Sequence, residues 1–348
     1  MKRALMSAAL VSSALVTGIT LAATASAAAP SGAKIAGVRA AAPTVSFVEA
    51  GDQDFSSVDV IYFTQLMKKN GINVKFTAVP DASSALRTVV AGQSDLFLGS
   101  LPTAILAVAN GGAHIKVIAA NDQASDYVLV AKPGITLQNI SGHTLAIDTP
   151  GSAGQVASEI GLQKSGVDPT TVHYVSIGSS SARLTAVLAG RVDIAPLHYP
   201  NALTALSTGK VNLLLNVGKA IGPYLQSGLI ASDSFVKNKA LTQKVVNAFI
   251  NSERWAASNK YKYITFGNAN KLDAGLTTDQ ESKVWDFYRD TNYFGVNGGI
   301  CYSNITAFAK LNWQIGSLPK PLPGRADWLN DSFVKNYLVA HHQKKTTC

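Results

Sequence analysis

Cysteine is scarce in this sequence of 348 residues. Cys301 and Cys348 are the only two, and neither has a cysteine or histidine companion at the spacing that a zinc site requires. The sequence therefore predicts no metal site. In an oxidising compartment the two thiols are expected to pair and to tie the C-terminus back to the body of the protein, with two unrelated thiols as the alternative.

Motifs for nucleotide binding and catalysis are absent as well. No GxxxxGK[ST] phosphate loop occurs, and the loop at 147–155 has glycines only at Gly151 and Gly154, which is no dinucleotide fingerprint. There is no HExxH motif and no cysteine nucleophile in a glycine-rich turn. The stretch GSSSA at 178–182 comes nearest to a nucleophile elbow, but it ends in alanine and has no histidine partner nearby in the sequence. We therefore expect no cofactor and no enzymatic activity.

Acidic side chains are the scarcer charge. The sequence has 21 aspartates and glutamates against 30 lysines and arginines, for a formal net charge of +9. The basic residues are spread along the chain and form no stripe interleaved with aromatics, so a nucleic-acid partner is not expected. A mildly positive surface slightly favours an anionic small molecule or partner.

The first 27 residues have the pattern of a secretory signal peptide. Lys2 and Arg3 precede an uncharged apolar run, which ends in the small-residue pattern ASA at 25–27. An uncleaved membrane anchor is the alternative, because the run approaches the roughly 20 residues that span a bilayer. Cleavage would leave a linker over 28–43 and a mature chain of formal charge +7, from 28 basic and 21 acidic side chains. The sequence thus predicts an exported protein, periplasmic or otherwise extracytoplasmic.

The sequence does contain a repeat. VVAGQSDLFLGS at 89–100 returns as VLAGRVDIAPLH at 187–198, and the flanking segments also have counterparts in the same order. Short β-branched segments alternate with apolar residues at helical spacing, and strands separated by helices need crossover connections. The repeat therefore predicts an α/β protein of two similar lobes with mainly parallel sheets, over 44–129 and 130–230.

The remaining residues, 231–348, contain helical patterns and no third copy of the repeat. We expect this part to pack on the first lobe, which leaves the lobes joined by two chain crossings, near 127–132 and 228–232. Two crossings make a hinge, with a ligand cleft between the lobes. The aspartates of the repeat, Asp95 and Asp193, are interpreted as turn or capping residues in preference to ligand contacts.

The cleft is expected at the carboxyl ends of the strands, where loops lead into helices. PDASSA at 80–85 and GSSSA at 178–182 each place serines at the start of a helix, whose free backbone N–H groups suit an oxoanion. The loop IDTPGSAGQ at 147–155 lets a ligand approach the next helix without a large side chain in the way. These serines are also ordinary helix caps, a role that is compatible with ligand contact.

The order of these segments resembles the solute-binding proteins of bacterial ABC transporters of the nitrate, sulfonate, taurine and thiamine-pyrimidine type. The resemblance is carried by SALRTVVAGQSDLFLGSLPTAILA, NISGHTLAIDTPGSAG and LAGRVDIA, within 44–200. It implies the type II periplasmic binding fold, a monomer whose lobes close on a small solute, and a membrane permease as partner. Carried over by position, it implies solute contacts from Gly51, Asp52, Ser83, Ser84, Ser100, Thr103, Thr149, Ser152, Ala153, Ser179, Ser180, His198 and Tyr199.

The first loop departs from the family pattern because it is acidic. Asp52 or Asp54 could therefore meet an amine on the ligand, although Asp54 is also placed to cap the next helix. Arg183 lies just inside a helix whose start is expected to face the cleft, where it neutralises an oxoanion or stands as a plain surface residue. His198 and Tyr199 could form an aromatic wall, with core packing as the alternative for Tyr199.

We therefore expect a protein that captures a small organic or oxoanionic solute, such as a sulfonate, taurine or nitrate, by hinge closure and delivers it to a permease. A thiamine-pyrimidine-like compound or another nitrogen heterocycle is the alternative solute. An exported sensor that hands its loaded form to a receptor, and an enzyme on the same fold, are the alternative functions.

Overall fold

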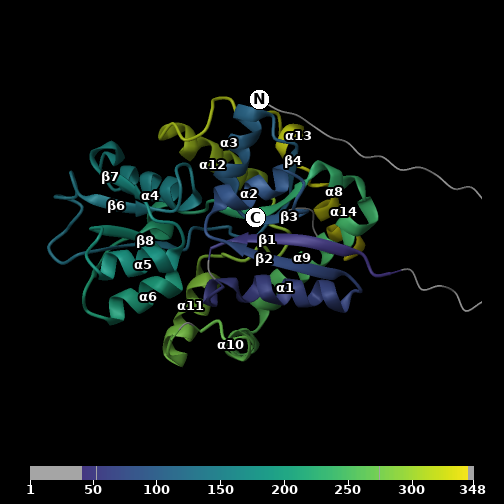
Figure 1. Cartoon of the computed structure of the whole chain (residues 1–348), viewed down its shortest axis with the longest axis horizontal. Helices are drawn as coiled ribbons and strands as arrows, with labels where there is room; N and C mark the ends of the chain where they lie inside the picture. Colours follow the sequence, from purple (N-terminus) through teal and green to yellow (C-terminus); the bar gives the residue numbers. More distant parts are fainter. Residues whose placement is uncertain (1–40, 52, 274, 344–348) are drawn as a thin grey trace, which may run out of the picture. The chain divides into compact units, whose positions relative to one another are not determined.

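Two five-stranded sheets form the framework of the computed structural model, which describes residues 41–343 except 52 and 274 (Figure 1). The predicted signal peptide lies outside the described residues. The first sheet has the spatial order β2 (Asn73–Val79), β1 (Thr44–Ala50), β3 (Leu96–Ser100), β10 (Ser227–Ser232) and β4 (Ile115–Ala120). The second has the order β7 (His173–Ser176), β6 (Thr144–Ile147), β8 (Ile194–His198), β5 (Tyr127–Ala131) and β9 (Asn212–Asn216). Both sheets belong to one compact unit, which begins at Ala42.

The two sheets have the same topology, as the repeat predicts. β1 pairs in parallel with β2 and β3, and β6 pairs in parallel with β7 and β8. β10 runs antiparallel to β3 and β4, while β5 runs antiparallel to β8 and β9. The antiparallel strand of each sheet is the one that the chain forms directly after crossing from the other sheet. The predicted fold, two similar α/β lobes joined by two crossings, is confirmed.

The crossings lie a few residues before the predicted positions. Segments 127–132 and 228–232, predicted as crossings, contain the strands β5 and β10, and the chain passes between the sheets ahead of each strand. Their backbone N–H and C=O groups need partners once buried, and a sheet supplies them. The predicted lobe boundary at 129–130 falls inside β5, all of which pairs within the second sheet. Tyr127 therefore stands at the start of the second lobe.

Helices lie on both sides of each sheet (Figure 1). The first lobe contains η1 (Phe55–Ser57), α1 (Val58–Lys69), α2 (Ala82–Val90) and α3 (Leu101–Gly111). The second lobe contains α4 (Ala153–Lys164), η2 (Pro169–Thr171), α5 (Ser180–Leu188), α6 (Tyr199–Ser207) and α7 (Val217–Ile221). After β10 follow α8 (Asp233–Lys237), α9 (Lys239–Ser258), α10 (Lys260–Ala269), α11 (Thr278–Asp290), α12 (Tyr302–Gln314), α13 (Arg325–Trp328) and α14 (Ser332–Ala340).

The helices after β10 contact both lobes. α9 packs against α1 and β4, and α13 and α14 also contact β4, so the first sheet carries most of this part. α11 additionally contacts α6, and α12 contacts α4, in the second lobe. Cys301, just before α12, is disulfide-bonded, while its predicted partner Cys348 lies outside the described residues. None of the described helices combines the length and the apolarity that crossing a membrane requires.

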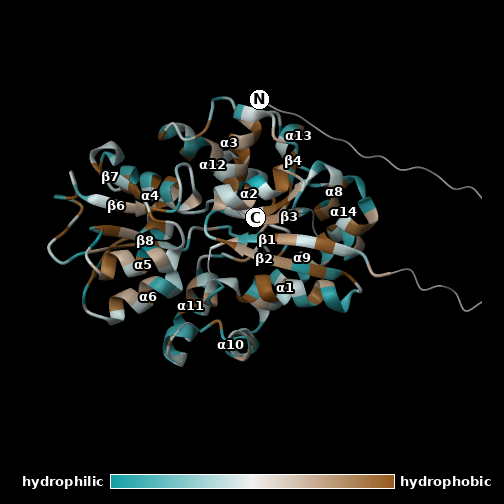
Figure 2. Ribbon diagram, in the orientation of Figure 1, coloured by the Kyte–Doolittle hydropathy of each residue, from teal (hydrophilic) through white to brown (hydrophobic). Residues whose placement is uncertain are grey.

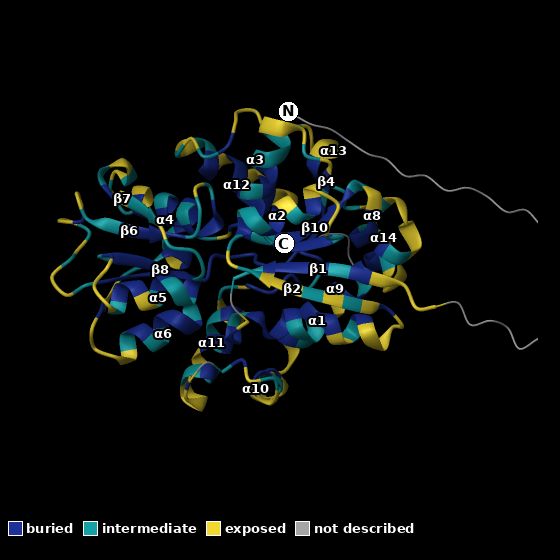
Figure 3. Cartoon of the chain, in the orientation of Figure 1, coloured by how far each residue is buried: buried dark blue, intermediate teal, exposed yellow. Residues whose placement is uncertain are grey.

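The central strands supply the core. Hydrophobic residues run along them (Figure 2), and they are among the most deeply buried elements (Figure 3). Every residue of β5 is buried, as is every residue of β10 after Ser227. Strands covered by helices on both faces have no solvent-facing side, which is why these segments are apolar without alternation.

The aspartates of the repeat are structural in both lobes. Oδ2 of Asp95 accepts hydrogen bonds from the backbone N–H and the hydroxyl of Ser46 in β1, at 2.8 and 2.7 Å. Oδ2 of Asp193 accepts the same two bonds from Thr144 in β6, at 2.9 and 2.8 Å. Lys132 adds an ion pair with Asp193 at 2.8 Å. The interpretation of both aspartates as capping residues is therefore confirmed.

Candidate functional site

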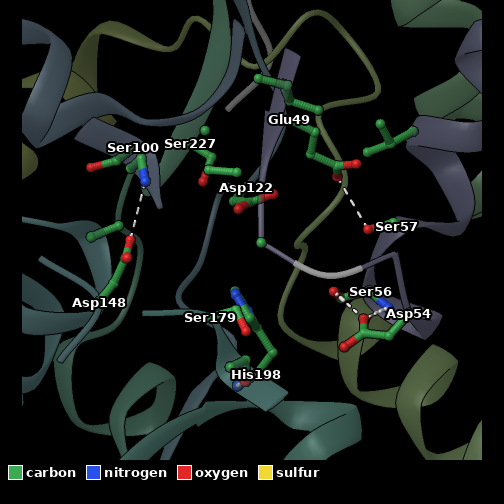
Figure 4. Close-up of a pocket in the computed structure, with 18 of the residues that line it drawn as sticks. Glu49, Asp54, Ser56, Ser57, Ser100, Asp122, Asp148, Ser179, His198 and Ser227 are labelled. Carbon is green, nitrogen blue, oxygen red and sulfur yellow. Dashed lines mark hydrogen bonds between the residues drawn. The ribbon is translucent and has the colours of Figure 1, made fainter. Parts of the chain in front are cut away.

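A cavity of about 100 Å³ lies between the lobes, beyond the carboxyl ends of strands from both sheets (Figure 4). The first lobe lines it with residues of β1, η1, β3, β10 and the loop after β4. The second lobe contributes residues of β5, the loop after β6, and the starts of α4 and α5 together with the end of β8. A space of this size holds several waters or one small solute.

The cavity contains part of the predicted contact set. Its lining includes Gly51, Ser100, Ala153, Ser179, Ser180 and His198. Asp52 lies outside the described residues. The other predicted contacts are not among the lining residues, and they are Ser83, Ser84, Thr103, Thr149, Ser152 and Tyr199. Each of these six side chains contacts another part of the protein.

Three of the six cap a helix or pack against a neighbouring ring. Ser84 donates its backbone N–H and its hydroxyl to the Asp81 carboxylate, at 2.7 and 2.6 Å, which caps α2. The Ser152 hydroxyl caps α4, as the helix-start pattern also predicts. Tyr199 stacks on Phe287 of α11 with ring centroids 4.2 Å apart, which agrees with the packing alternative.

The other three join the two lobes. The Ser83 and Thr149 hydroxyls lie 3.1 Å apart, across the gap between α2 and the loop after β6. The Thr103 hydroxyl donates to the Gly151 carbonyl at 3.2 Å. We call these two contacts, with the two described next, the interlobe bonds. Their presence means that the structure has the two lobes closed against each other.

Two further interlobe bonds involve carboxylates. Oδ2 of Asp148, after β6, accepts from the backbone N–H of Ala82 at 3.4 Å, at the start of α2. Oδ2 of Asp54 accepts from the Asn201 side chain of α6 at 3.0 Å. Oδ1 of Asp54 accepts from the backbone N–H of Ser56 at 2.8 Å, so its predicted capping role is confirmed while it also lines the cavity.

Three further carboxyl groups, which the sequence did not predict, line the cavity. Glu49 at the end of β1, Asp122 after β4 and Asp148 after β6 all line it (Figure 4). Burial raises the pKa of Glu49 to about 8, and burial together with the Asp126 charge raises the pKa of Asp122 to about 7. Burial also raises the pKa of Asp148 above its usual value. Only one weak sequence signal pointed to them, which is the position of Glu49 near the end of a mostly apolar strand.

His198 lines the cavity and is held by a buried aspartate behind it, Asp126. Nδ1 of His198 lies 2.9 Å from both carboxylate oxygens of Asp126, which is fully buried. Gln226 and Tyr288 also donate to this carboxylate, at 3.1 and 3.4 Å. Burial opposes the charge of His198, but Asp126 outweighs it and holds the pKa of His198 above its usual value. The Tyr127 ring covers the imidazole, with ring centroids 4.5 Å apart.

Arg183 is buried, not on the surface as one interpretation had it. Only 2% of the residue is exposed. Its Nε donates to the Pro196 carbonyl at 2.8 Å, and its Nη1 donates to the Gly178 carbonyl. The guanidinium therefore ties α5 to β8 and to the preceding loop while still lining the cavity. Within the described residues, no group of three or more histidine, cysteine, aspartate and glutamate side chains is placed to hold a metal ion.

The amino-acid sequence that forms these two lobes and their cavity also matches a known protein family. The family described as NMT1/THI5 like matches residues 64–260, more than half of the chain. The chain belongs to the NMT1/THI5-like family. No curated protein matches its sequence significantly.

Solved structures show the same fold for this NMT1/THI5-like protein. The alkanesulfonate-binding protein SsuA of Xanthomonas axonopodis pv. citri, bound to MOPS, is 16% identical with a TM-score of 0.67, over 84% of this chain and 100% of its own. A ligand-binding component of an ABC-type import system from Staphylococcus aureus, with zinc bound, is 14% identical with a TM-score of 0.70, over 85% and 99%. The periplasmic nitrate-binding protein NrtA of Synechocystis is 12% identical with a TM-score of 0.70, over 85% and 88%. At these identities the likeness establishes the fold.

Proposed function

We propose that this NMT1/THI5-like protein is the extracytoplasmic solute-binding component of an ABC importer. The observation that carries the proposal is a small cavity whose lining comes from both lobes, at the strand ends where α/β proteins bind ligands. The structural neighbours named for ABC import and for sulfonate and nitrate binding support it. We further propose that the protein is exported by its N-terminal signal peptide and works as a monomer with a membrane permease.

Capture would proceed by closure of the two lobes about their two crossings. The interlobe bonds, such as Ser83 to Thr149 and Asp148 to Ala82, exist only when the lobes meet. A solute that contacts both lobes adds interactions that the open form lacks, so its binding shifts the population toward the closed form. The permease or, in the alternative, a receptor would then recognise the closed shape.

Two solute classes have support from the lining. A sulfonate, taurine or nitrate-like oxoanion is favoured by Arg183 and by the start of α5 at Ser179 and Ser180. A thiamine-pyrimidine-like compound or another nitrogen heterocycle is favoured by the acidic side chains and by the neighbouring Tyr127 and His198 rings. Both classes fit a binder in which a few directed hydrogen bonds supply most of the affinity.

A binding role is favoured over catalysis because the helix-start serines and the histidine of the cavity are tied to structural partners. The Ser179 hydroxyl caps α5, and the Ser100 hydroxyl caps α3. The His198 imidazole is held by Asp126. Among the described contacts, the imidazole accepts no hydrogen bond from a serine hydroxyl. A serine nucleophile would need such a base within hydrogen-bond reach.

Thermal-shift measurements on the stripped protein test the proposal. A solute at about 100 times its dissociation constant stabilises the fold by about 2.7 kcal/mol, which raises the Tm of a chain of this size by about 4 °C. Ser56→Trp fills the cavity and should abolish the shift, whereas Ser207→Trp, at an exposed position at the end of α6, should retain it. Uniformly flat results with sulfonates, nitrate, pyrimidines and amines would refute the binder proposal.

A further inference from the structure

Several acceptor atoms around the cavity have no hydrogen-bond partner among the described residues. Four of its lining residues each have one buried side-chain oxygen without a hydrogen-bond partner, and these are Oε2 of Glu49 and Oδ1 of Asn121, Asp122 and Asp148. All four atoms are acceptors when the carboxyl groups are ionised. A buried acceptor without a partner costs free energy, and most buried polar groups in proteins are paired. A bound solute that donates hydrogen bonds would remove this cost.

The carboxyl groups reach the cavity from both lobes, and the two from the first lobe are deeply buried. Glu49 is 8% exposed and Asp122 is 3% exposed. Asp148 faces them from the second lobe, and Figure 4 shows the three groups around the same space. Burial disfavours the ionised forms of Glu49 and Asp122, and neighbouring aspartates add to it, Asp59 and Asp54 at Glu49 and Asp126 at Asp122, so the pKa values of both groups are raised. A positive charge placed between them would offset both effects.

The donors near these oxygens are already engaged, and hydrogen bonds from Ser227 and Tyr293 only partly offset the raised pKa of Asp122. The Ser57 hydroxyl donates to Oε1 of Glu49 at 3.1 Å, which leaves Oε2 open. The guanidinium of Arg183 donates to two backbone carbonyls, and the N–H of Ala82 at the start of α2 donates to the other oxygen of Asp148. The start of α2, which the sequence offered to an oxoanion, is therefore occupied by a carboxylate of the protein itself.

We infer that the solute presents a protonated nitrogen, as an ammonium, amidinium or guanidinium group, to Glu49 and Asp122. The inference rests on the proposed solute-binding function and names the chemical class of its ligand. An N–H-rich cation supplies donors to Oε2 of Glu49 and Oδ1 of Asp122 at once, and its charge compensates the carboxylates. Asp148 and Asn121 offer further acceptors to a second N–H group of the same cation. Arg183 also lines the cavity, and its charge partly offsets the raised pKa of Asp148, so the unmet need for a cation is greatest at Glu49 and Asp122.

A matched ligand panel separates this inference from the proposed function. Isothermal titration calorimetry on the stripped protein would compare guanidinium, methylguanidine, agmatine and propylamine with propanesulfonate, nitrate and propanol, and would include taurine as a zwitterion. Binding of cations, with no binding of the uncharged and purely anionic probes, is the expected result. Binding of an anion or of propanol without any cation would overturn the inference and leave the solute-binding function standing. Absence of binding across the panel would count against both.

Variants locate the cation. Glu49→Gln and Asp122→Asn keep the side-chain shape and should weaken cation binding by roughly ten- to hundredfold each, because each removes a charge-assisted hydrogen bond. Glu159→Gln in α4, a half-buried glutamate outside the cavity lining, is the matched control and should bind as the parent does. Equal affinity of all three variants for a cation would overturn the assignment to Glu49 and Asp122. The ligand panel on the parent protein decides the class even where a variant fails to fold.

Discussion

The affinity for a cation should depend steeply on pH, because the two carboxyl groups that receive it titrate near neutrality. The pKa of Asp122 is raised to about 7 and that of Glu49 to about 8, mainly by burial. At pH 6 both are largely protonated and uncharged. A bound cation favours their ionised forms and lowers both pKa values, so affinity must rise as pH increases through the values of the free protein.

The size of the effect follows from these two values. With a pKa of about 7, about a tenth of Asp122 is ionised at pH 6 and about nine tenths at pH 8, so the apparent Kd at pH 6 is about tenfold larger, or about 1.4 kcal/mol weaker. A requirement that Glu49 also ionise raises the ratio to several hundredfold, on the order of 500.

The charged neighbours do not reverse this sign. Asp54 and Asp59 raise the pKa of Glu49 further, and His198 opposes them. Asp126 and Asp59 likewise raise the pKa of Asp122. An oxoanion at the same place would show the opposite dependence, because it would be repelled by the carboxylates as they ionise.

Calorimetry at pH 6, 7 and 8 measures the effect directly. The ligand should be whichever of guanidinium, methylguanidine and agmatine binds best, since a guanidinium group stays charged throughout this range. Paired buffers of different ionisation enthalpy report the protons exchanged, and we expect release of at least about half a proton per cation at pH 7. Asp122→Asn should flatten the pH dependence. Constant affinity from pH 6 to 8, or proton uptake on binding, would refute the reasoning.

Two further predictions test the interlobe bonds and the repeated aspartates. Thr149→Val keeps the side-chain shape but removes the hydrogen bond to Ser83, which contributes about 0.5–1.5 kcal/mol. Calorimetry should therefore show solute binding that is weaker by up to about tenfold. An unchanged Kd would mean that this bond does not stabilise the closed form. Asp95→Ala and Asp193→Ala each remove two charge-assisted bonds and should lower the free energy of unfolding by about 2–4 kcal/mol in chemical denaturation. The two losses should agree within about 1 kcal/mol, the usual worth of a surface pair such as that of Lys132 with Asp193, and a larger gap would contradict their equivalent roles.

The fold was predictable because its signals are local and occur twice. Buried parallel strands such as 96–100 are continuous apolar runs, and glycine ends the helices before them. The exchange of β5 and β10 between the lobes was not predictable in the same way. A short apolar segment shows that it is a strand, but its sheet is decided by partners about a hundred residues away, such as Ser227 pairing with Ser100.

The candidate site was predictable only where helix starts mark the strand ends. Ser100, Ser179 and His198 were found because each follows a predicted strand. Asp122 follows β4 in a crossing segment that belongs to neither copy of the repeat, so no pattern pointed to it. Ser84 was predicted as a contact because a serine at a helix start suits both a cap and a ligand, and the Asp81 carboxylate decided between them.

Comparison of equivalent residues in the two copies of the repeat distinguishes residues that maintain the fold from residues that we assign to solute binding. Counted from the equivalent positions Ser46 and Thr144, which bind the two repeated aspartates, Glu49 corresponds to Ile147, a residue that is 2% exposed. By the same count Ser100 corresponds to His198. The Ser100 hydroxyl caps its helix, whereas the His198 ring makes no cap and binds Asp126 instead.

Selection for folding alone would keep both members of such a pair similar, because the two strands pack in the same way in their lobes. The aspartates meet that expectation, and Glu49 and His198 do not. Glu49 also carries a buried oxygen without a partner, a cost that the apolar counterpart Ile147 avoids. The positions where the two copies diverge toward costly polar groups are therefore the ones that we assign to the solute. Replacing Glu49 by isoleucine, the residue of its counterpart, should raise the stability of the solute-free protein while it abolishes cation binding, and a loss of stability would argue that Glu49 is part of the scaffold.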